Sequence, residues 1–528
     1  MNRTERRWII TVALVLLIAG NLPYLAATVA RPEGYLFTGL LVNPLDGHSY
    51  IAKMRQGLAG SWRFRLAFTP ETHPGAYLFL AHIALGHLAR WTSLPLIVVY
   101  HGARILAGMF LLAVLYAFVA MYEESRERRR MAFLIAATSA GLGWLVSPLT
   151  GRPSPDLWVP EAFVFYSLLA NFHFPLSIAL MLAIMVALAR PGREPGVRET
   201  FFAVLASVGL GVLQPFAVIP VYAALSLRLV LRLIPWPLGV RRESLPWRAT
   251  WCTAVAALIA LAYPVYGLWA IRSDPLLSNW NAQNLTPSPP IWDWLVGFGL
   301  PALLALPGLV AAARRRSEGD LLPPAWTLVA VTGMYTPLTL QRRLSIGLQI
   351  PVALLATRGW WEVIRPHLRP RLRPVAQAAI TGFSAVGNLF LVGMLIMAAL
   401  AREPLFYISE AEWRAITWLR EEGAPDAVVM CAPTTGMFIP AWAGQRVVYG
   451  HPFETVDAAQ REARVTAFWS GAMSRAERER FLAENNVRYL FIGPEERTLG
   501  EPVIPEGARL RFRFRDVVIY ELEACQAA

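Results

Sequence analysis

The stretch LPLIVVYHGARILAGMFLLAVLYAFVAMYEESRERRR, residues 94–130, is a long apolar run that ends in a cluster of arginines. The run from Leu94 to Tyr122 is longer than the roughly 20 residues that a helix needs to cross a bilayer. Loops rich in arginine stay on the cytoplasmic side, so the cluster at residues 126–130 predicts that this helix ends inside the cell. The stretch therefore predicts a membrane-spanning helix and its direction.

Similar apolar runs recur along most of the chain. It has 528 residues, 55% of them hydrophobic and 16% charged, and its mean hydropathy is +0.42. These values exclude an ordinary soluble enzyme. Arginine-rich loops alternate with the runs, which predicts a multi-pass all-α membrane bundle of about eleven transmembrane helices. The predicted spans are residues 8–30, 94–122, 131–148, 174–189, 201–213, 216–233, 250–271, 291–313, 326–340, 344–361 and 375–400.

One apolar run does not fit a crossing. Residues 76–91 are short for a span and carry His82, His87 and Arg90. His82 and Arg90 lie on one helical face, since they are eight residues apart. If this run crossed the bilayer, the arginine cluster at residues 126–130 would lie outside the cell. We therefore expect a helix that lies in the membrane interface.

The positive charge of the chain belongs to its membrane topology. The formal net charge is +13, but Lys53 is the only lysine, and the arginines gather in short loops between apolar runs. This distribution argues against a nucleic-acid partner. The basic N-terminus before Trp8 predicts an uncleaved first span with its N-terminus in the cytoplasm. The expected location is the cytoplasmic membrane, with the lipid bilayer as a partner.

The composition changes at about Glu403, where a smaller domain is expected. A Ser start followed by an acidic residue predicts a helix over residues 409–422, and further helices are predicted over residues 458–470 and 474–485. Short strands are predicted at residues 427–431, 487–492, 510–514 and 517–522. We expect a transmembrane domain over residues 1–402, with a large first outer loop at 31–93. A soluble α/β domain outside the cell, residues 403–528, completes the predicted organisation.

The first outer loop contains the densest group of reactive side chains. The stretch Asn43-Pro-Leu-Asp-Gly-His-Ser-Tyr50 brings together the carboxylate of Asp46, the imidazole of His48 and the phenol of Tyr50. Polar groups beside a membrane are costly unless they are used, so this loop is predicted to be the edge of an active site. The alternative for Asp46 is that it N-caps a helix over residues 47–58.

Two histidines and a glutamate of this loop form an alternative metal site. His48, Glu71 and His73 are metal-ligating types, but their spacing matches no specific motif. Glu71 and His73 are equally typical of ordinary polar loop structure. No cofactor is therefore assigned, and a divalent metal is left open.

Three arginines occupy unusual positions for a membrane protein. Arg104 lies about ten residues inside the span that starts at Leu94, which favours a polar cavity or a partner over snorkelling to the interface. Arg342 and Arg343 lie at a predicted outer hairpin, against the positive-inside tendency. Adjacent guanidiniums there suit a phosphate or diphosphate ligand, with a lipid headgroup as the weaker alternative.

Other predicted outer loops carry acids and sugar-binding side-chain types. Asp156 and Glu161 lie in the second outer loop. Asn171 and His173 at the end of this loop, and Gln283 and Asn284 in a later one, are types that contact sugars but are equally common in polar loops. With Tyr50, they are candidates for sugar or acceptor contacts.

The order of these features resembles the C-type (GT-C) integral-membrane glycosyltransferases, the superfamily of protein mannosyltransferases and aminoarabinose transferases. The likeness covers nearly the whole chain and extends to uncharacterised bacterial members with a similar first loop, here NPLDGHSYIAKMRQGLAG (43–60), and a similar outer-domain stretch, here RVVYGHPFET (446–455). The resemblance implies a polyprenyl-phosphate sugar as donor and Asp46 as the base. It also implies that Arg342, Arg343 and Arg104 hold the lipid phosphate.

One departure from the family pattern concerns the second acid. Many members have an acid directly after the first-loop aspartate, whereas this chain has Gly47. Glu71, Asp156 or Glu161 would then supply any second acidic group, and the use of a metal and the class of acceptor are left in doubt. The outer domain carries no obvious catalytic cluster and is expected to bind the acceptor or act as a structural lid.

The expected function is therefore transfer of a sugar, with inversion, from a polyprenyl-phosphate donor to a hydroxyl of a glycan, lipid or protein at the outer face of the membrane. A transporter or flippase of lipid-linked sugars is the first alternative, although the chain shows neither repeat symmetry nor paired broken helices. A non-catalytic scaffold for envelope assembly is the second.

Overall fold

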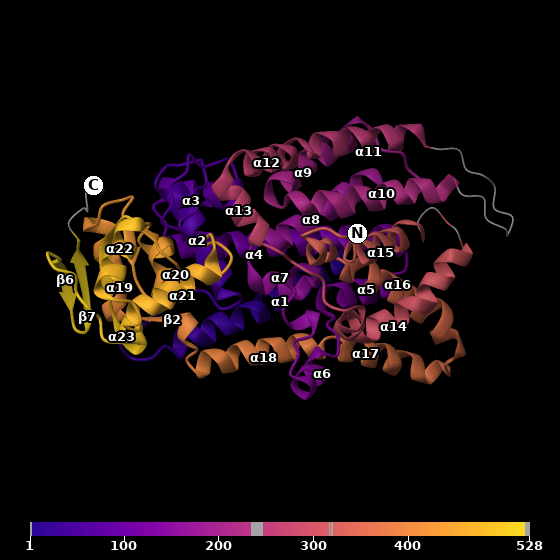
Figure 1. Ribbon diagram of the computed structural model, residues 1–528. Helices are drawn as coiled ribbons and strands as arrows, with labels where there is room; N and C mark the ends of the chain where they lie inside the picture. Colours follow the sequence, from indigo (N-terminus) through magenta and orange to yellow (C-terminus); the bar gives the residue numbers. More distant parts are fainter. Residues whose placement is uncertain (1–2, 234–245, 316, 318–319, 523–528) are drawn as a thin grey trace. The chain divides into compact units, whose positions relative to one another are not determined.

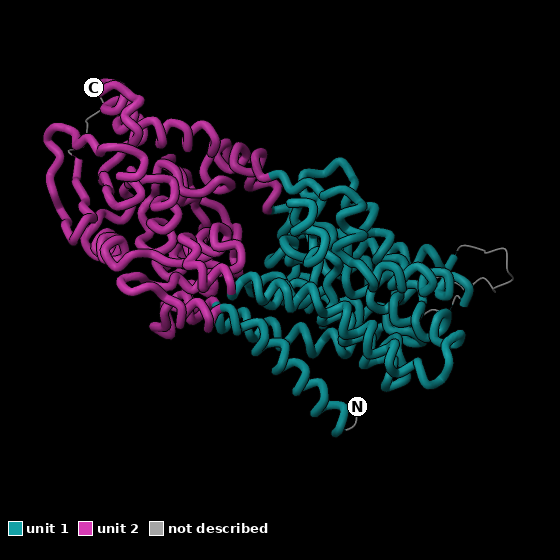
Figure 2. The backbone as a smooth tube through the Cα atoms, turned by 90° about the horizontal axis from the view of Figure 1, so that it is seen from below, with its two compact units in different colours: residues 1–23, 101–266, 285–396 teal, residues 24–100, 267–284, 397–528 magenta. Residues whose placement is uncertain are grey.

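The computed structural model describes residues 3–233, 246–315, 317 and 320–522 (Figure 1). Two compact units are each built from three separate stretches of the chain (Figure 2). Unit 1 contains residues 1–23, 101–266 and 285–396, and unit 2 contains residues 24–100, 267–284 and 397–528. The predicted first outer loop and the predicted C-terminal domain therefore belong to the same compact unit.

The described residues confirm a multi-pass helical membrane protein. Seven helical segments are long and apolar enough to cross a membrane by length and composition: Arg3–Val29, Leu96–Tyr122, Arg126–Thr150, Pro215–Leu233, Trp247–Ser273, Ile291–Arg315 and Pro370–Leu400. The predicted number of eleven spans stays a prediction. The short run at residues 76–91 forms the 13-residue helix α3, Leu80–Thr92, which is not among these segments.

The helices of the apolar part are α1 Arg3–Val29, α4 Leu96–Tyr122, α5 Arg126–Thr138, α6 Gly143–Thr150, α7 Val164–Ala170, α8 His173–Leu188, α9 Val197–Leu213, α10 Val218–Leu233, α11 Trp247–Ala260, α12 Ala262–Ser273, α14 Ile291–Arg315, α15 Leu322–Gly333, α16 Gln349–Arg358, α17 Arg373–Ser384 and α18 Val386–Leu400. Short 3-10 turns are η1 Pro155–Leu157, η2 Pro160–Ala162, η3 Pro215–Ala217, η5 Gln341–Ser345, η7 Arg365–His367 and η8 Pro370–Leu372; η6, Gly359–Ile364, is a π-helical turn.

Within unit 2, the first loop folds around two closely packed helices. Helix α2, Pro44–Leu58, crosses α3 where glycines face each other's backbone. A Cβ on Gly57 would lie 2.0 Å from the carbonyl oxygen of Ile83, and one on Gly86 would lie 1.9 Å from that of Met54. Neither site has room for a side chain, so these glycines allow the two helices to touch.

The C-terminal part of unit 2 is an α/β sandwich. Its five-stranded sheet has the order β4-β3-β5-β7-β6, in which β3, β4 and β5 are parallel and β6 and β7 antiparallel. The strands are β3 Val428–Met430, β4 Arg446–Val447, β5 Val487–Ile492, β6 Arg509–Phe514 and β7 Val517–Glu521, and the helices are α19 Glu410–Glu422, α20 Pro433–Trp442, α21 Ala458–Trp469, α22 Arg475–Glu484 and α23 Pro494–Leu499. The predicted helices and strands are confirmed within a few residues. Helix α19 begins with the predicted Ser409 cap, and Figure 1 shows it beside β6 and β7.

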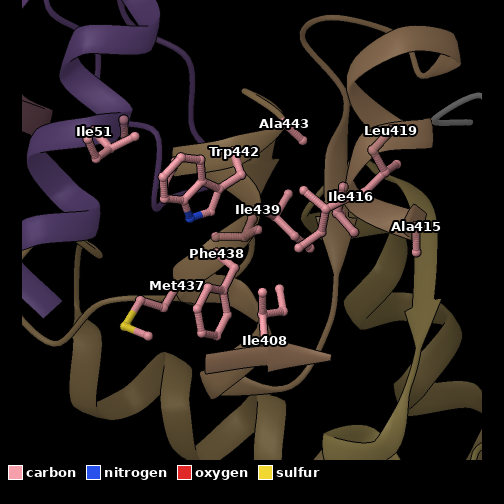
Figure 3. Packing of buried hydrophobic residues seen from close by; sticks show 14 of the residues in the cluster. Ile51, Ile408, Ala415, Ile416, Leu419, Met437, Phe438, Ile439, Trp442 and Ala443 are labelled. Atoms are coloured by element: carbon pink, nitrogen blue, oxygen red, sulfur yellow. The ribbon is translucent and has the colours of Figure 1, made fainter. Parts of the chain in front are cut away.

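The sheet is covered on both faces, because successive residues of a strand point to opposite sides. In β5, Tyr489 and Phe491 pack with α19 and α20, whereas Leu490 and Ile492 pack with α21 and α22. Ile51 of α2 lies in the first of these cores, near Phe438 and Trp442 of α20 (Figure 3). The first loop is therefore part of the hydrophobic core of the C-terminal domain.

A two-stranded antiparallel ribbon also joins these parts of unit 2. Strand β1, Tyr35–Phe37, pairs with β2, Tyr407–Ser409. Residues 267–284, the middle stretch of unit 2, contain helix α13, Pro275–Gln283.

Candidate active site

Asp46 lies in the first turn of α2. The helix begins at Pro44 because proline is favourable at the first helical position, where no N–H bond is lost. Its N-cap is Asn43, with a φ of 47° and no side-chain capping bond, so the alternative that Asp46 is the cap was wrong. Asp46 is half-buried, and the helix N-terminus favours its negative charge.

Lys53, on the same helix, is buried beneath aromatic rings. Its side chain is 2% exposed, and Nζ lies 4.4 Å from the ring centroid of Phe79, with Tyr50 and Phe64 at 5.6 and 5.5 Å. A buried ammonium needs a counter-ion, and Nζ is 2.8 Å from Oε1 of Glu454. Lys53 also donates a hydrogen bond to the hydroxyl of Ser49.

Glu454 comes from the segment that follows β4 in the C-terminal sheet. Besides the ion pair, it accepts a hydrogen bond of 2.9 Å from the Ser49 hydroxyl. Burial alone would raise the pKa of this carboxyl group, but the charges of Lys53 and His451 and the bonds from Lys53 and Ser49 outweigh burial and lower it. Glu454 is therefore favoured as an anion, and Lys53 neutralises its charge.

His451 comes from the same segment as Glu454. Its side chain is buried, and Nδ1 accepts a hydrogen bond of 3.1 Å from the backbone N–H of Phe453. Burial lowers the pKa of His451, whereas the charges of Glu454 and Asp46 oppose that change. His451 is therefore within electrostatic reach of both carboxylates. We call Asp46, Ser49, Lys53, His451 and Glu454 the first-loop cluster.

The segment that carries His451 and Glu454 is held by two predicted sugar-contact residues. The amide nitrogen of Gln283 donates to the carbonyl of Thr455, at 2.5 Å, and that of Asn284 donates to the carbonyl of Phe453, at 2.9 Å. Their side-chain N–H groups are thus directed at the protein backbone. Contact with a sugar by either residue stays a prediction.

His48 and Tyr50 have structural surroundings. His48 is fully buried, donates from Nδ1 to the carbonyl of Pro44 at 2.7 Å, and meets the ring of Phe438 edge-on at 4.8 Å. Burial lowers the pKa of His48 to about 4, so its imidazole is neutral. The ring of Tyr50 stacks on His82 at 4.7 Å.

The residues of the metal alternative are not gathered into one site. Nε2 of His73 accepts a 2.9 Å bond from the N–H of Leu66, so Nδ1 carries the proton and donates to the carboxylate of Asp274 at 3.1 Å. Both ring nitrogens are occupied, and Glu71 is paired with Arg461. In the described residues, no group of three His, Cys, Asp or Glu side chains is placed to hold a metal ion. These donors do not fit a metal, and no chemical step is assigned to one.

In unit 1, the predicted second acids support the fold of their own loop, residues 151–163. Oδ2 of Asp156 accepts bonds from the backbone N–H groups of Gly141, at 3.0 Å, and Gly143, at 3.3 Å. Asp156 is 1% exposed, and burial raises its pKa to about 6 despite these bonds. Oε1 of Glu161 lies 3.5 Å from Nε of Arg342.

The arginines predicted to hold phosphate also have protein neighbours within unit 1. The guanidinium of Arg342 lies 4.6 Å from the ring of Trp158, and that of Arg343 lies 5.4 Å from the ring of Phe216. Both residues lie on η5, and the side chain of Arg342 is 24% exposed. A role in phosphate binding stays a prediction for both.

Arg104 is buried inside unit 1 and does not snorkel. It donates to the carbonyl of Leu168 at 2.7 Å, to the side-chain oxygen of Asn21 at 2.6 Å and to Nδ1 of His101 at 3.2 Å. These bonds link α4 to α1 and α7. A bound phosphate would have to share the guanidinium with these acceptors.

The remaining pair, Asn171 and His173, lies at the start of α8. Oδ1 of Asn171 accepts the N–H of Phe174 at 3.2 Å, and the buried ring of His173 lies 4.4 Å from that of Phe174. Both residues thus have local structural contacts, and a sugar contact stays a prediction for each.

The sequence analysis gave no role to four members of the first-loop cluster, although the two stretches that carry the family resemblance contain them: Ser49, Lys53, His451 and Glu454. A further signal was present for Lys53, because it is the only lysine in an arginine-rich chain. A chain that uses arginine everywhere else has a specific requirement at that position. The outer domain, in which the sequence analysis found no obvious catalytic cluster, contributes His451 and Glu454 to the first-loop cluster, and its role in acceptor binding or as a structural lid stays a prediction.

Comparisons with known proteins identify the fold. No family model and no curated protein matches the sequence. Solved structures do match, and they give the chain the fold of the C-type integral-membrane glycosyltransferases, as the sequence resemblance predicted.

Two enzymes are among the matched structures. ArnT from Cupriavidus metallidurans, bound to undecaprenyl phosphate, is 12% identical, and the match covers 99% of this chain and 98% of ArnT with a TM-score of 0.56. The oligosaccharyltransferase AglB from Archaeoglobus fulgidus, in complex with an inhibitory peptide and a dolichol-phosphate, is 14% identical over 93% of this chain and 70% of AglB, with a TM-score of 0.51. An AglB complex with Zn and sulfate matches at 12% identity over 90% and 67%, with a TM-score of 0.50.

Proposed function

We propose that this protein is a membrane glycosyltransferase that moves a sugar from a polyprenyl-phosphate donor to an acceptor hydroxyl. The fold supports the class, since the matched ArnT structure holds undecaprenyl phosphate and the matched AglB structure holds a dolichol-phosphate. We propose that the reaction occurs at the extracytoplasmic face of the cytoplasmic membrane. The clustering of arginines in the opposite loops supports this orientation, with the N-terminus in the cytoplasm.

The observation that carries the proposal is the state of the Asp46 carboxylate. Among the described residues it accepts no hydrogen bond and forms no ion pair, and it is half-exposed. The other candidate acids are engaged: Glu71 with Arg461, Asp156 with two backbone N–H groups, and Glu161 with Arg342. In the first-loop cluster, Lys53 neutralises Glu454. Asp46 is therefore the available base.

The chemistry needs one such carboxylate. The acceptor hydroxyl gives its proton to Asp46 while its oxygen forms a bond to the anomeric carbon of the donor sugar. The bond between that carbon and the phosphate oxygen breaks, and its electron pair leaves with the polyprenyl phosphate. Attack opposite to the leaving group inverts the anomeric configuration. Arg342 and Arg343 are proposed to stabilise the charge on the departing phosphate.

The remaining cluster residues are proposed to position Asp46. Lys53 and Ser49 bind Glu454 to α2, and the charges of Glu454 and Asp46 both act on the buried His451. The acceptor is a hydroxyl of a glycan, a lipid or a protein.

The test uses the purified full-length protein in nanodiscs and a panel of radiolabelled polyprenyl-phosphate sugars. Release or transfer of the sugar is measured for the wild type, for Asp46→Asn and for Glu33→Gln, in which an exposed acid of the same outer loop is neutralised. Loss of general-base catalysis is expected to lower turnover by roughly 100- to 10,000-fold in Asp46→Asn. Glu33→Gln is expected to match the wild type.

Two outcomes would overturn the proposal in different ways. Equal turnover by wild type and Asp46→Asn would remove Asp46 from the chemistry. Absence of both turnover and donor binding across the panel would favour a transporter of lipid-linked sugars or an envelope-assembly scaffold. Donor binding that is lost when Arg342 and Arg343 are replaced by glutamine would support their role at the phosphate.

A further inference from the structure

A groove in unit 1 lies between α5 and the start of α17, and none of its lining residues takes part in the proposed reaction. Its volume is about 750 Å³. It is lined by Glu127, Arg130, Met131, Leu134, Arg365, Pro370, Arg373, Pro374, Gln377, Ala378, Thr381 and Gly382. The charged residues of the lining are thus three arginines and one glutamate.

The arginines of the groove form no ion pairs with acids in the described part of the chain. Arg130 lies over the ring of Trp8 at 4.6 Å, and Arg365 lies over the ring of Trp361 at 4.1 Å. The Nε atoms of both arginines are buried and have no hydrogen-bond acceptor among the described residues. A buried donor without an acceptor is costly, so an anionic ligand would stabilise this arrangement. Arg373 donates to the carbonyl oxygens of Leu368 and Pro366.

The nearby acids are engaged with other arginines. Glu362 pairs with Arg128 and Arg315, and Glu123 pairs with Arg128 and Arg358. Neither acid lines the groove. Among the residues that line the groove, Glu127 is the one acid, and it is exposed.

The rest of the lining identifies the source of the anion. Met131, Leu134 and Ala378 form an apolar wall, and Val375, next to the groove on α17, is 66% exposed. The groove also lies at the arginine-rich ends of two candidate spans, Arg126–Thr150 and Pro370–Leu400. A water-soluble anion would make no use of the apolar wall, whereas a lipid brings both a phosphate and acyl chains.

We propose that this groove binds an anionic phospholipid, with the phosphodiester held by Arg130, Arg365 and Arg373 and the acyl chains against α5 and α17. Guanidiniums match phosphate oxygens in geometry and charge. Basic pockets between membrane helices on the cytoplasmic side suit such headgroups, and the arginine-rich loops assign the groove to that side. The site is independent of the sugar-transfer reaction.

The test measures lipid retention by native mass spectrometry after purification of the full chain from membranes that contain phosphatidylglycerol and phosphatidylcholine. The groove variant is Arg130→Gln/Arg365→Gln/Arg373→Gln. The control is Arg126→Gln/Arg369→Gln/Arg371→Gln, which removes the same charge from exposed arginines outside the groove. We expect the wild type and the control to retain phosphatidylglycerol over phosphatidylcholine by about tenfold or more, and the groove variant to lose this preference.

A second variant keeps the proposal testable if the triple substitution does not fold. Ala378→Trp keeps every arginine but fills the groove, and it is also expected to lose the bound lipid. Equal loss in the exposed-arginine control would mean general surface attraction and would overturn the proposal. So would retention by both groove variants, or displacement of the lipid by millimolar inorganic phosphate, which would indicate a soluble anion.

Discussion

The first-loop cluster of unit 2 and the 151–163 loop of unit 1 both bury carboxylates where a loop meets a helix, but they use them differently. In the loop, backbone N–H groups bind Asp156, and Arg342 lies beside Glu161. In the cluster, Lys53 neutralises Glu454, and Asp46 stays half-exposed. The presence of an acid therefore does not identify a reactive group. A reactive carboxylate is distinguished by how few hydrogen-bond donors the protein itself supplies to it.

The largest expected effect on stability comes from breaking the buried ion pair. Lys53→Met would leave Glu454 without its counter-ion and is expected to lower the free energy of unfolding by about 3–5 kcal/mol. Chemical denaturation of the full chain in detergent measures it. The double variant Lys53→Met/Glu454→Gln should recover most of the loss, because no buried charge remains.

An exposed ion pair of the same unit provides the control for this experiment. Arg414→Met removes one of the two arginine partners of Glu410 on α19, the other being Arg515. The side chains of Arg414 and Glu410 are 54% and 33% exposed, so the loss should cost at most about 1 kcal/mol. If Lys53→Met cost no more than this control, the first-loop cluster would not be a buried charge site.

The second effect is a pH dependence from His48. Its folded pKa of about 4 lies below its ordinary value of 6.5, so the unfolded chain binds more protons between these values. Stability is therefore expected to fall by about 3 kcal/mol as the pH drops from 6.5 to 4. In His48→Asn, whose amide can still donate to the Pro44 carbonyl, this contribution should disappear.

The measurement is the free energy of unfolding at several pH values for the wild type, His48→Asn and His367→Asn. His367 is exposed, so its replacement should leave the pH profile of the wild type unchanged. Identical profiles for the wild type and His48→Asn would contradict the burial of a neutral imidazole at position 48.

The smallest expected effect sharpens the comparison most directly. Asp156→Ala would leave the N–H groups of Gly141 and Gly143 without an acceptor and should lower stability by about 1–3 kcal/mol. Turnover per folded molecule should stay near the wild-type value. Asp46→Asn should give the reverse, with turnover lost and stability kept. Loss of turnover in a well-folded Asp156 variant would show that Asp156 takes part in the chemistry.

The sequence predicted what depends on neighbouring residues. The capping box at Ser409 and the apolar strand at residues 487–492 were located because their signals are local. The membrane runs were equally clear, since apolar length is visible in any short window. The alternative that Asp46 caps a helix over residues 47–58 was wrong, because the helix begins earlier, at Pro44.

The missing parts of the site depend on contacts between distant residues. Lys53 and Glu454 are separated by 401 positions, and no local pattern relates them. Strand β4 has only two residues, too few for a periodic signal, yet it leads into His451 and Glu454. Gln283 and Asn284 resembled sugar-binding residues, but their amide groups hold the backbone of the same segment. Side-chain type alone could not distinguish these roles.

The single lysine of the chain has a practical consequence. Reagents that acylate lysine side chains have one target in this sequence, and the native fold buries it beneath Phe79 and two further rings. Any modification therefore reports a moment at which α2 separates from Glu454. The rate of acylation, followed by mass spectrometry, therefore measures how often this site opens. A bound acceptor or donor that keeps the site closed would lower this rate.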